Sequence, residues 1–403
     1  MSWAAYLADT MTGLLAAPID LPSFSWSVSV SDSSLATTRD KGVGEDEGSG
    51  IRVPWSAVPA STASQRAAAL CADKRSIVLA WRTGRDPEEI GTPILMGAIS
   101  PRTDTASDTS FSLSSPMGML ENRFLTGDFG LNASGGTSWT KSFSNMSLRG
   151  IASEVGWLCT NAKPGGELPI DWTYRGETGT HERTYKGFNV QNQSGADILE
   201  KIADVQDGPD MQFRPYLTGD GMHVRWRFTA GSDAGIFLGQ DAVHRLAYHP
   251  SGGTIEGLTV DHVGPVMRVY ATGSGTDEAQ LCHLSEDLSL VRSPDPWPLK
   301  EMAWSDTDTD DRSLLERHAD ATLAANRRPI MQIKGEIHVD DVDASGLPIH
   351  PMGSFWPGEL FSLDVDGFPS LPDGTYECRL MRMDGDETDK VTLTFDVTED
   401  PSI

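Results

Sequence analysis

The sequence has few cysteines, and they form none of the patterns that mark metal or redox sites. Cys71, Cys159, Cys282 and Cys378 lie far apart, without a C-x-x-C pair and without histidines at zinc-finger spacing. Neither a structural zinc site nor a redox dithiol is therefore indicated. The four thiols are expected to be buried, as small hydrophobic side chains.

Long apolar runs are also absent. No run approaches the roughly 18 apolar residues that a membrane-spanning helix needs. Residues 1–18 have some apolar character, but they carry Asp9 and no basic segment, which makes them a poor signal peptide. We therefore expect synthesis in a cytosol without export.

Positive charge is scarce relative to negative charge. The chain has 32 lysines and arginines against 58 aspartates and glutamates, which gives a formal net charge of −26. Such a chain repels phosphate backbones and anionic lipids, which argues against a nucleic-acid-binding or membrane-docking protein. The same charge would suit the wall of a channel through which DNA slides without sticking.

Turn-forming residues, in contrast, are abundant, with 40 glycines and 24 prolines among 403 residues. This composition favours short strands joined by tight turns over long helices. The length indicates two to four domains. We find no fixed-period repeat, heptad pattern or collagen triplet in the sequence, which disfavours a fibre or a solenoid.

The first 116 residues are predicted to be all-β. Apolar and polar residues alternate strictly over 24–30, which is typical of a half-buried strand. Three more strands are expected at 76–82, 91–100 and 111–114. Residues 40–50 are rich in glycine and charge, and they are predicted to form a mobile loop.

Two helices and a hairpin are predicted in the middle of the chain. Apolar residues at helical spacing indicate a helix from Ser147, which the Pro-Gly-Gly at 164–166 stops. A second helix begins at Ser194, which with Asp197 resembles a capping box, and ends at the Gly-Pro at 208–209. The alternating runs 211–217 and 222–228 surround a Gly-Asp-Gly turn and predict a β-hairpin.

The last third is predicted to return to strands. One helix is expected there, with Ser313 as its N-cap and a stop at the Arg-Pro of 328–329. Asp384, Gly385 and Asp386 are predicted to form the turn between the last two strands. The strands are expected at 255–262, 266–271, 331–339, 360–365, 375–383 and 391–397.

The densest acidic cluster, at 306–311, does not match a calcium loop. An EF-hand needs Gly at its sixth position and Glu at its twelfth, where this sequence has Asp311 and Arg317. The carboxylates are instead expected to stabilise the positive end of the helix that follows. A second acidic group, Asp340, Asp341 and Asp343, precedes a Ser-Gly pair and is predicted to be a solvated turn.

None of the nine histidines lies in a recognisable catalytic or metal-binding pattern. His181 and Glu182 lack the second histidine of a zinc-protease helix, and an expected turn separates His244 from His249. The G-x-S-x-G, G-x-x-x-x-G-K-[ST] and G-x-G-x-x-G patterns are absent from the sequence. No catalytic, cofactor-binding or metal-ligating residue is therefore predicted, and no cofactor.

Eleven tryptophans leave a sugar-binding surface open as an alternative. Trp26, Trp81 and Trp226 lie in strand patterns and are predicted to be core residues. Four others lie near proline-containing segments, which leaves open that they are exposed at the surface: Trp55, Trp297, Trp304 and Trp356.

Several segments of the chain carry a family resemblance. They are 94–101, 120–125, the helix and hairpin segments 198–203, 211–216 and 224–228, and the later segments 325–330 and 356–359. In their order these segments resemble the hub, or minor tail, proteins at the tail tip of long-tailed phages of high-GC Gram-positive hosts. That family is related in fold to the baseplate hub of contractile-tailed phages.

The predicted fold class is β-rich α+β and multidomain, and baseplate-hub-like. β-barrel-like domains near both ends flank an α+β middle. The expected boundaries are 1–116 for an N-terminal tube-like barrel, 117–245 for the α+β middle, 246–325 for connecting strands and one helix, and 326–403 for a C-terminal tube-like barrel. Insertion of one β-rich unit within another is common in this family and would shift these boundaries.

The resemblance implies a structural virion protein without enzymatic activity. It implies a homotrimer in which two barrels per subunit join the six-fold tail tube or distal tail ring to a three-fold tip and form part of the DNA channel. The implied partners are the distal tail or tail tube protein, the tape measure protein and tip or receptor-binding proteins. DNA would be passing cargo only, and the protein would reside in the virion tail tip after synthesis in the host cytoplasm.

One alternative within the same class of tail proteins stays open, and so do two other classes of function. A distal tail protein would form a hexameric ring, although three central helices favour the hub. The second class is a cell-wall glycan hydrolase of the tail tip, which is supported only by the abundant carboxylates and some exposed tryptophans. The third class is a carbohydrate-binding adhesin that docks the particle on its host. The chain is expected to leave no room for a C-terminal hydrolase module.

Overall fold

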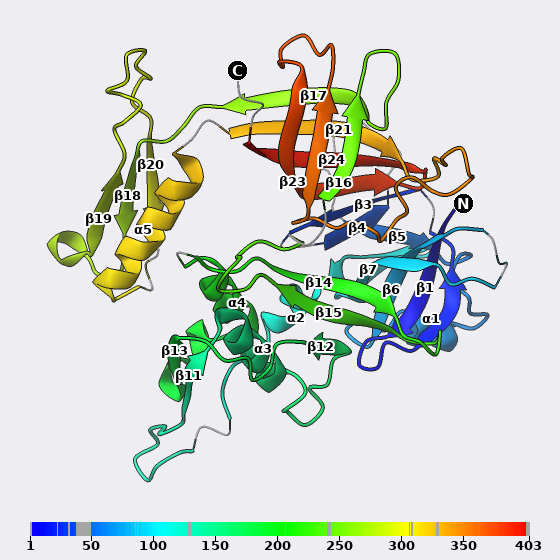
Figure 1. Ribbon diagram of the computed structural model, residues 1–403. Helices are drawn as coiled ribbons and strands as arrows, with labels where there is room; N and C mark the ends of the chain where they lie inside the picture. Colours follow the sequence, from blue (N-terminus) through cyan, green and yellow to red (C-terminus); the bar gives the residue numbers. More distant parts are fainter. Residues whose placement is uncertain are drawn as a thin grey trace.

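The computed structural model describes residues 2–21, 23–30, 33–37, 50–84, 86, 88–127, 130–205, 207–239, 243–305, 307, 309–327 and 330–399. The predicted loop at 40–50 lies outside these residues except for Gly50, and so does the predicted helix stop at 328–329. The β-rich, multidomain α+β class is confirmed (Figure 1). Within the described residues, the sheets are open, and none closes into a complete barrel.

The N-terminal sheet has both faces buried. Its strand β6 (Arg75–Arg82) alternates between two cores, with Ile77, Leu79 and Trp81 in one and Val78 and Ala80 in the other. This explains the nearly continuous apolar run of the strand. The sheet is antiparallel in the order β10-β7-β6-β1-β2, with β1 Ser2–Asp9, β2 Leu15–Ile19, β7 Thr92–Ile99 and β10 Leu113–Ser114.

The C-terminal sheet incorporates a strand from the beginning of the chain. Strand β3 (Phe24–Ser29) pairs antiparallel with β23 (Gly374–Asp386), with Trp26 opposite Gly385, and β4 (Ser33–Thr37) pairs with β3. The remaining strands follow the order β16-β22-β23-β24-β21-β17. Their bounds are β16 Val243–Tyr248, β17 Glu256–Val263, β21 Ile330–His338, β22 Leu360–Val365 and β24 Lys390–Glu399.

The predicted turn at Asp384, Gly385 and Asp386 is wrong. These residues are the last of β23, and the turn to β24 occupies 387–389. A tertiary contact explains the glycine in this strand, because a Cβ atom at Gly385 would lie 2.6 Å from the Trp26 ring. The glycine is therefore needed for the close approach of β3 and not for a turn.

The middle of the chain covers the other face of the N-terminal sheet with helices and short strands. The predicted helices are confirmed as α3 (Leu148–Cys159) and α4 (Gly195–Ala203), with Ser147 and Ser194 as their N-caps, but α4 ends before the predicted stop at 208–209. The predicted hairpin is confirmed as β14 (Met211–Leu217) and β15 (Val224–Ala230). Shorter elements complete this part: α2 Pro116–Leu120, β11 Thr140–Met146, β12 Ile170–Trp172, β13 His181–Lys186 and the 3₁₀ helix Gly187–Asn192.

A small three-stranded sheet with one helix lies between β17 and β21 in the sequence. It contains β18 (Arg268–Thr272), β19 (Cys282–Glu286), β20 (Glu301–Ser305) and α5 (Arg312–Asn326), and Figure 1 shows it standing beside the main body. Since β17 and β21 pair directly, this unit is inserted within the C-terminal sheet. The helix begins one residue before Ser313, and Asp311 is its N-cap because its carboxylate accepts from the amides of Ser313 and Leu314.

Some local expectations for the first third need correction. The strand predicted at 111–114 is two strands, β9 (Asp108–Phe111) and β10, with Ser112 between them. β9 belongs to a separate small sheet with β5 (Ile51–Pro54) and β8 (Thr103–Asp104), and the short helix α1 (Ala63–Ala69) lies nearby in sequence. Two of the four cysteines are buried as expected, but Cys282 is exposed and Cys71 is half-buried.

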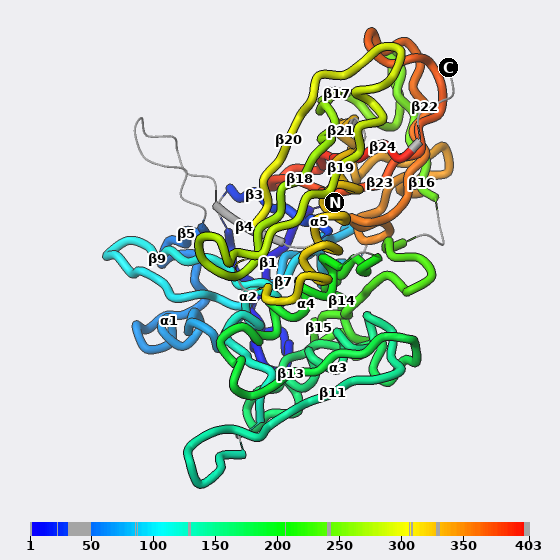
Figure 2. Tube along the Cα trace, turned by 90° about the vertical axis from the view of Figure 1, so that its left-hand side faces the viewer, coloured from blue at the N-terminus to red at the C-terminus, as the bar shows by residue number. Residues whose placement is uncertain are grey.

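Two hydrophobic cores lie on the two sides of the N-terminal sheet. The first joins this sheet to the C-terminal sheet and contains Leu79, Trp81, Leu363 and Phe395. The second joins it to helices α3 and α4. Figure 2 gives the same order in a second view, with the C-terminal strands above, β1 and β7 between, and α3 below. The four boundaries expected from the sequence stay a prediction, but the first core contains residues from both ends of the chain.

The N-cap of α4 supplies a local test of helix stability. Ser194 is buried, and its hydroxyl oxygen accepts from the Asp197 amide at 3.0 Å. Ser194→Ala is expected to lower the free energy of unfolding by about 1 kcal/mol, and Ser194→Gly by only a few tenths, although glycine removes more atoms. Urea denaturation followed by circular dichroism measures both. An equal or larger loss for glycine would mean that packing, and not capping, decides the effect.

Candidate functional site

A cleft of about 660 Å³ opens where the three parts of the fold meet. We call it the junction cleft. Its walls come from the start of β7, from the hairpin β14–β15, and from the segment that precedes β22. The lining residues are Gly91, Thr92, Pro93, Arg214, Pro215, Tyr216, Leu217, Arg227, Thr229, Gly353, Ser354, Trp356 and Glu359.

A mostly buried ion pair crosses the junction cleft. Arg214 Nη1 on β14 donates to Glu359 Oε1 at 2.7 Å, and their side chains are 19% and 12% exposed. His244 on β16 lies with its Nε2 3.1 Å from Glu359 Oε2, and the Trp356 amide donates to the same oxygen at 3.2 Å. Glu359 therefore joins the middle of the chain to two segments of the C-terminal sheet region.

The same hydrogen-bond network extends to β3, the strand from the beginning of the chain that belongs to the C-terminal sheet. Arg214 Nε donates to Gln212 Oε1 at 2.7 Å, and Gln212 Nε2 donates to the Ser29 carbonyl of β3 at 2.9 Å. The guanidinium group of Arg214 also lies 5.7 Å from the centre of the Trp356 ring. These contacts hold β14 against β3 and against the segment that precedes β22.

The charges in the junction cleft stay ionised despite burial. Burial acts to raise the pKa of Glu359, but the hydrogen bonds from His244 and Arg214 outweigh it, and the pKa lies below its ordinary value. Burial lowers the pKa of Arg214, which Glu359 partly offsets. Among the described residues that line the cleft, none is a histidine, cysteine or lysine. This lining suits a structural junction better than acid–base or nucleophilic chemistry.

Most residues weighed from the sequence lie apart from the junction cleft. His181 is in strand β13, with its Nε2 3.4 Å from Asp233, and His249 lies 3.6 Å from Asp366. His244 is the exception, because its partner Glu359 lines the cleft. Within the acidic cluster, Asp306 and Asp308 lie outside the described residues, while Asp311 caps α5.

The tryptophans divide between core and surface. Trp26, Trp81 and Trp226 are buried, as predicted. Of the tryptophans for which the sequence left an exposed position open, Trp297 is 41% exposed, but Trp356 is only 7% exposed. Its burial follows from the packing of Phe355 and Trp356 into the first core. Trp55 and Trp304 are half-buried.

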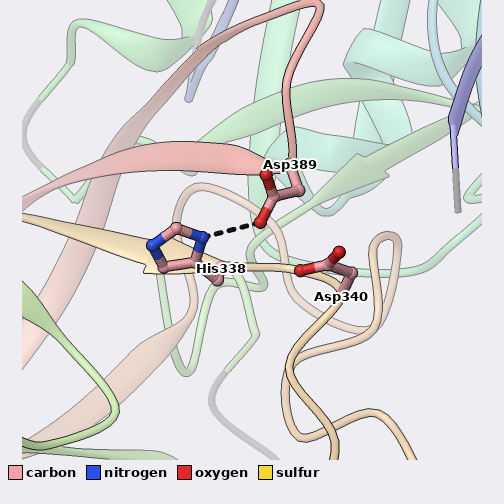
Figure 3. Close-up of side chains that lie close together, drawn as sticks. All are labelled: His338, Asp340 and Asp389. Atoms are coloured by element: carbon pink, nitrogen blue, oxygen red, sulfur yellow. Dashed lines mark hydrogen bonds and ion pairs between the residues drawn. The ribbon is translucent and has the colours of Figure 1, made fainter.

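A second cluster of titratable side chains lies at the end of β21 (Figure 3). It consists of His338, Asp340 and Asp389, and we call it the His338 cluster. Nδ1 of His338 lies 2.6 Å from Asp389 Oδ2, and Nε2 lies 3.1 Å from Glu256 Oε1. Hydrogen bonds to Asp389 and Glu256 raise the pKa of His338, and the hydrogen bond to His338 lowers the pKa of Asp389.

No local pattern in the sequence points to the junction cleft or to the His338 cluster. Asp340 lies in the segment predicted to be a solvated turn, and it is exposed, but strand pairing brings it next to Asp389, some 49 positions later. The hydrogen bond with Asp389 raises the pKa of Asp340. Glu359 and Arg214 are likewise far apart in sequence. Only the register of the sheets, which no local pattern encodes, could have identified these groups.

Comparison with known proteins finds similarity at the level of structure. No protein-family model and no curated protein sequence matches the chain. The solved structures similar to it include tail proteins of phages and prophages. Among them are the tail protein from Neisseria meningitidis MC58, with 11% identity, a TM-score of 0.47 and coverage of 99% of this chain and 97% of that one.

Two prophage proteins are similar to a comparable degree. The 43 kDa tail protein of prophage MuSo2 from Shewanella oneidensis has 8% identity, a TM-score of 0.47 and coverage of 98% of each chain. The prophage tail protein gp18 from Listeria monocytogenes EGD-e has 10% identity, a TM-score of 0.42 and coverage of 99% of this chain and 95% of that one.

Proposed function

We propose that this protein is a structural component of a phage tail, and that three copies form the hub at the tail tip. The observation that carries the proposal is the joining of two sheets, from opposite ends of the chain, through one hydrophobic core. Two such units per subunit, repeated three times, would present six similar units around an axis. A trimer of this kind would join a six-fold tube or distal tail ring to a three-fold tip.

The firmness of the connection between the two units supports this role. β3 is a strand of the C-terminal sheet, and the Arg214–Glu359 pair fastens β14 to the same sheet. A subunit in which the two units kept a fixed angle would transmit symmetry from tube to tip. A subunit with a flexible linker between them would not.

The charge supports a place beside the DNA channel. With a formal net charge of −26, a wall built from this chain would repel DNA and let it pass as cargo. The proposed partners are the distal tail or tail tube protein, the tape measure protein and tip or receptor-binding proteins. Among the described residues, we find no helix with the length and hydropathy that crossing a bilayer requires.

A structural role without catalysis fits the junction cleft. Its single carboxylate is held by Arg214 and His244, which leaves it poorly placed to exchange protons with a substrate. We therefore propose no enzymatic activity. A hydrolase would be revealed by release of reducing sugar from purified host cell wall, and an adhesin by binding of the isolated protein to host envelope.

The mass of the purified protein in solution tests the hub directly. Light scattering over a range of concentrations is expected to give about three times the 43.6 kDa of one chain, and negative-stain images are expected to show a three-fold ring with a central hole. A six-fold ring would contradict the hub and favour the distal tail protein. A compact monomer at every concentration would contradict both ring proteins.

A further inference from the structure

The His338 cluster brings together three side chains of the kinds that bind transition metals. One ligand atom each from His338, Asp340 and Asp389 lies within 4.8 Å of the other two. The cluster depends on strand pairing, because His338 ends β21, the Val339 amide donates to the Asp389 carbonyl at 3.0 Å, and β24 begins at the next residue. The backbone therefore fixes two of the three side chains at adjacent positions of the sheet.

The imidazole of His338 is oriented in the way that metal-ligating histidines are oriented. Its Nε2 is engaged by Glu256 Oε1 at 3.1 Å, which leaves Nδ1 directed at Asp389 on the side where Asp340 lies (Figure 3). Lys390 in turn contacts Glu256 at 3.5 Å and Glu336 at 3.0 Å. A histidine whose second nitrogen is held by a hydrogen-bonded carboxylate is the usual arrangement around protein-bound zinc.

The balance of charge also favours a cation at this position. Asp340 and Asp389 lie side by side, and the cation that faces them is His338, while Lys390 is directed at Glu256 and Glu336. Two neighbouring carboxylates repel each other, and a divalent cation held between them would relieve that repulsion. On binding, the ion would displace the proton that lies between His338 and Asp389.

We propose that His338, Asp340 and Asp389 bind a divalent transition-metal ion, with zinc as the best match. One imidazole nitrogen and two carboxylate oxygens suit Zn²⁺, which needs four ligands and can take water as the fourth. Calcium and magnesium prefer sites made of oxygen alone. The partial exposure of His338 and the exposure of Asp340 leave a path for the ion and for water.

The bound ion would reinforce the contact between the two ends of the chain. The turn at 387–389 that carries Asp389 also accepts hydrogen bonds from the N-terminal region: Trp3 Nε1 donates to the Thr388 carbonyl at 2.7 Å, and Ser23 donates to Glu387 at 3.0 Å. An ion at Asp389 would fix this turn against β21. The proposal does not depend on the tail-hub role and stands or fails separately from it.

Isothermal titration of the full, untagged chain with ZnCl₂ tests the site. The wild type is expected to bind one zinc ion per chain, and its thermal unfolding temperature is expected to rise in saturating zinc. Asp340→Asn changes an exposed turn residue, so it is expected to fold normally and to lose zinc affinity at least 10-fold, as is His338→Ala. Glu256→Gln is expected to lower zinc affinity about 10- to 100-fold, the range for a residue that orients a metal ligand through a hydrogen bond.

His283→Ala is the matched control. His283 also has two carboxylates near it, Glu316 at 3.6 Å and Asp320 at 4.0 Å, but they face different ring nitrogens and do not converge. This variant is expected to bind zinc as the wild type does. The proposal is overturned if the wild type shows no saturable binding, if Asp340→Asn and His338→Ala bind unchanged, or if calcium binds as tightly as zinc.

Discussion

Trp26→Ala is expected to lower the free energy of unfolding by about 3 to 5 kcal/mol, the cost of removing a large aromatic side chain from a packed core. Trp26 is 2% exposed, its ring lies 5.2 Å from that of Trp3, and it lies against Gly385. The loss should be accompanied by detachment of β3 from β23. Urea denaturation measures the free energy, and hydrogen exchange over 24–29 and 382–386 measures the pairing.

Two variants separate this packing effect from a general sensitivity of the tryptophans. Trp297→Ala removes a side chain that is 41% exposed and is expected to change the free energy of unfolding by no more than about 0.5 kcal/mol. Trp26→Phe keeps an aromatic ring at the same position and is expected to recover much of the loss. Unchanged hydrogen exchange in β3 of Trp26→Ala would contradict the proposed part of this residue in joining the two sheets.

Glu359→Ala is expected to destabilise the protein by about 3 to 5 kcal/mol, because it leaves the buried guanidinium of Arg214 without its anion. The loss depends on pH. The folded-state pKa of Glu359 lies below its ordinary value, so its contribution is complete above the ordinary pKa and disappears as the pH falls through the folded-state pKa. Thermal unfolding of both proteins from neutral to acidic pH should show the difference between them narrowing in acid.

An exposed ion pair supplies the control for Glu359. Asp261 lies 3.0 Å from Lys334, and the two side chains are 57% and 43% exposed. Asp261→Ala is expected to cost less than about 1 kcal/mol, because solvent screens such pairs. Equal losses for Asp261→Ala and Glu359→Ala would show that the junction cleft has no special part in stability.

The elements that the sequence could predict are those fixed by neighbouring residues. Ser147 and Ser194 cap their helices through bonds to residues three positions away, and the hairpin of β14 and β15 follows from the alternation on either side of its turn. Asp384-Gly385-Asp386 carries the same kind of local turn signal, yet it is a strand. Its conformation is decided by Trp26, which no local pattern connects with it.

The candidate sites could not be predicted for the same reason. Arg214 and Glu359, or His338 and Asp389, are ordinary charged residues in a sequence that has many, and their meaning arises only from the register that brings them together. Tertiary packing also decides the position of Trp356, for which the neighbouring prolines left a surface position open. The cation of Arg214 and the first core cover it instead.

The pairing of β3 with β23 has a consequence for synthesis on the ribosome. Roughly 350 residues separate the two strands, so at about 5 to 20 residues per second β3 emerges on the order of 20 to 70 seconds before its partner. The N-terminal sheet and the middle of the chain can fold during this interval, but the edge of β3 that pairs with β23 has no partner strand. The nascent chain therefore carries an unpaired strand edge at β3 until almost its last strand is made, and such an edge is a site where another chain can pair.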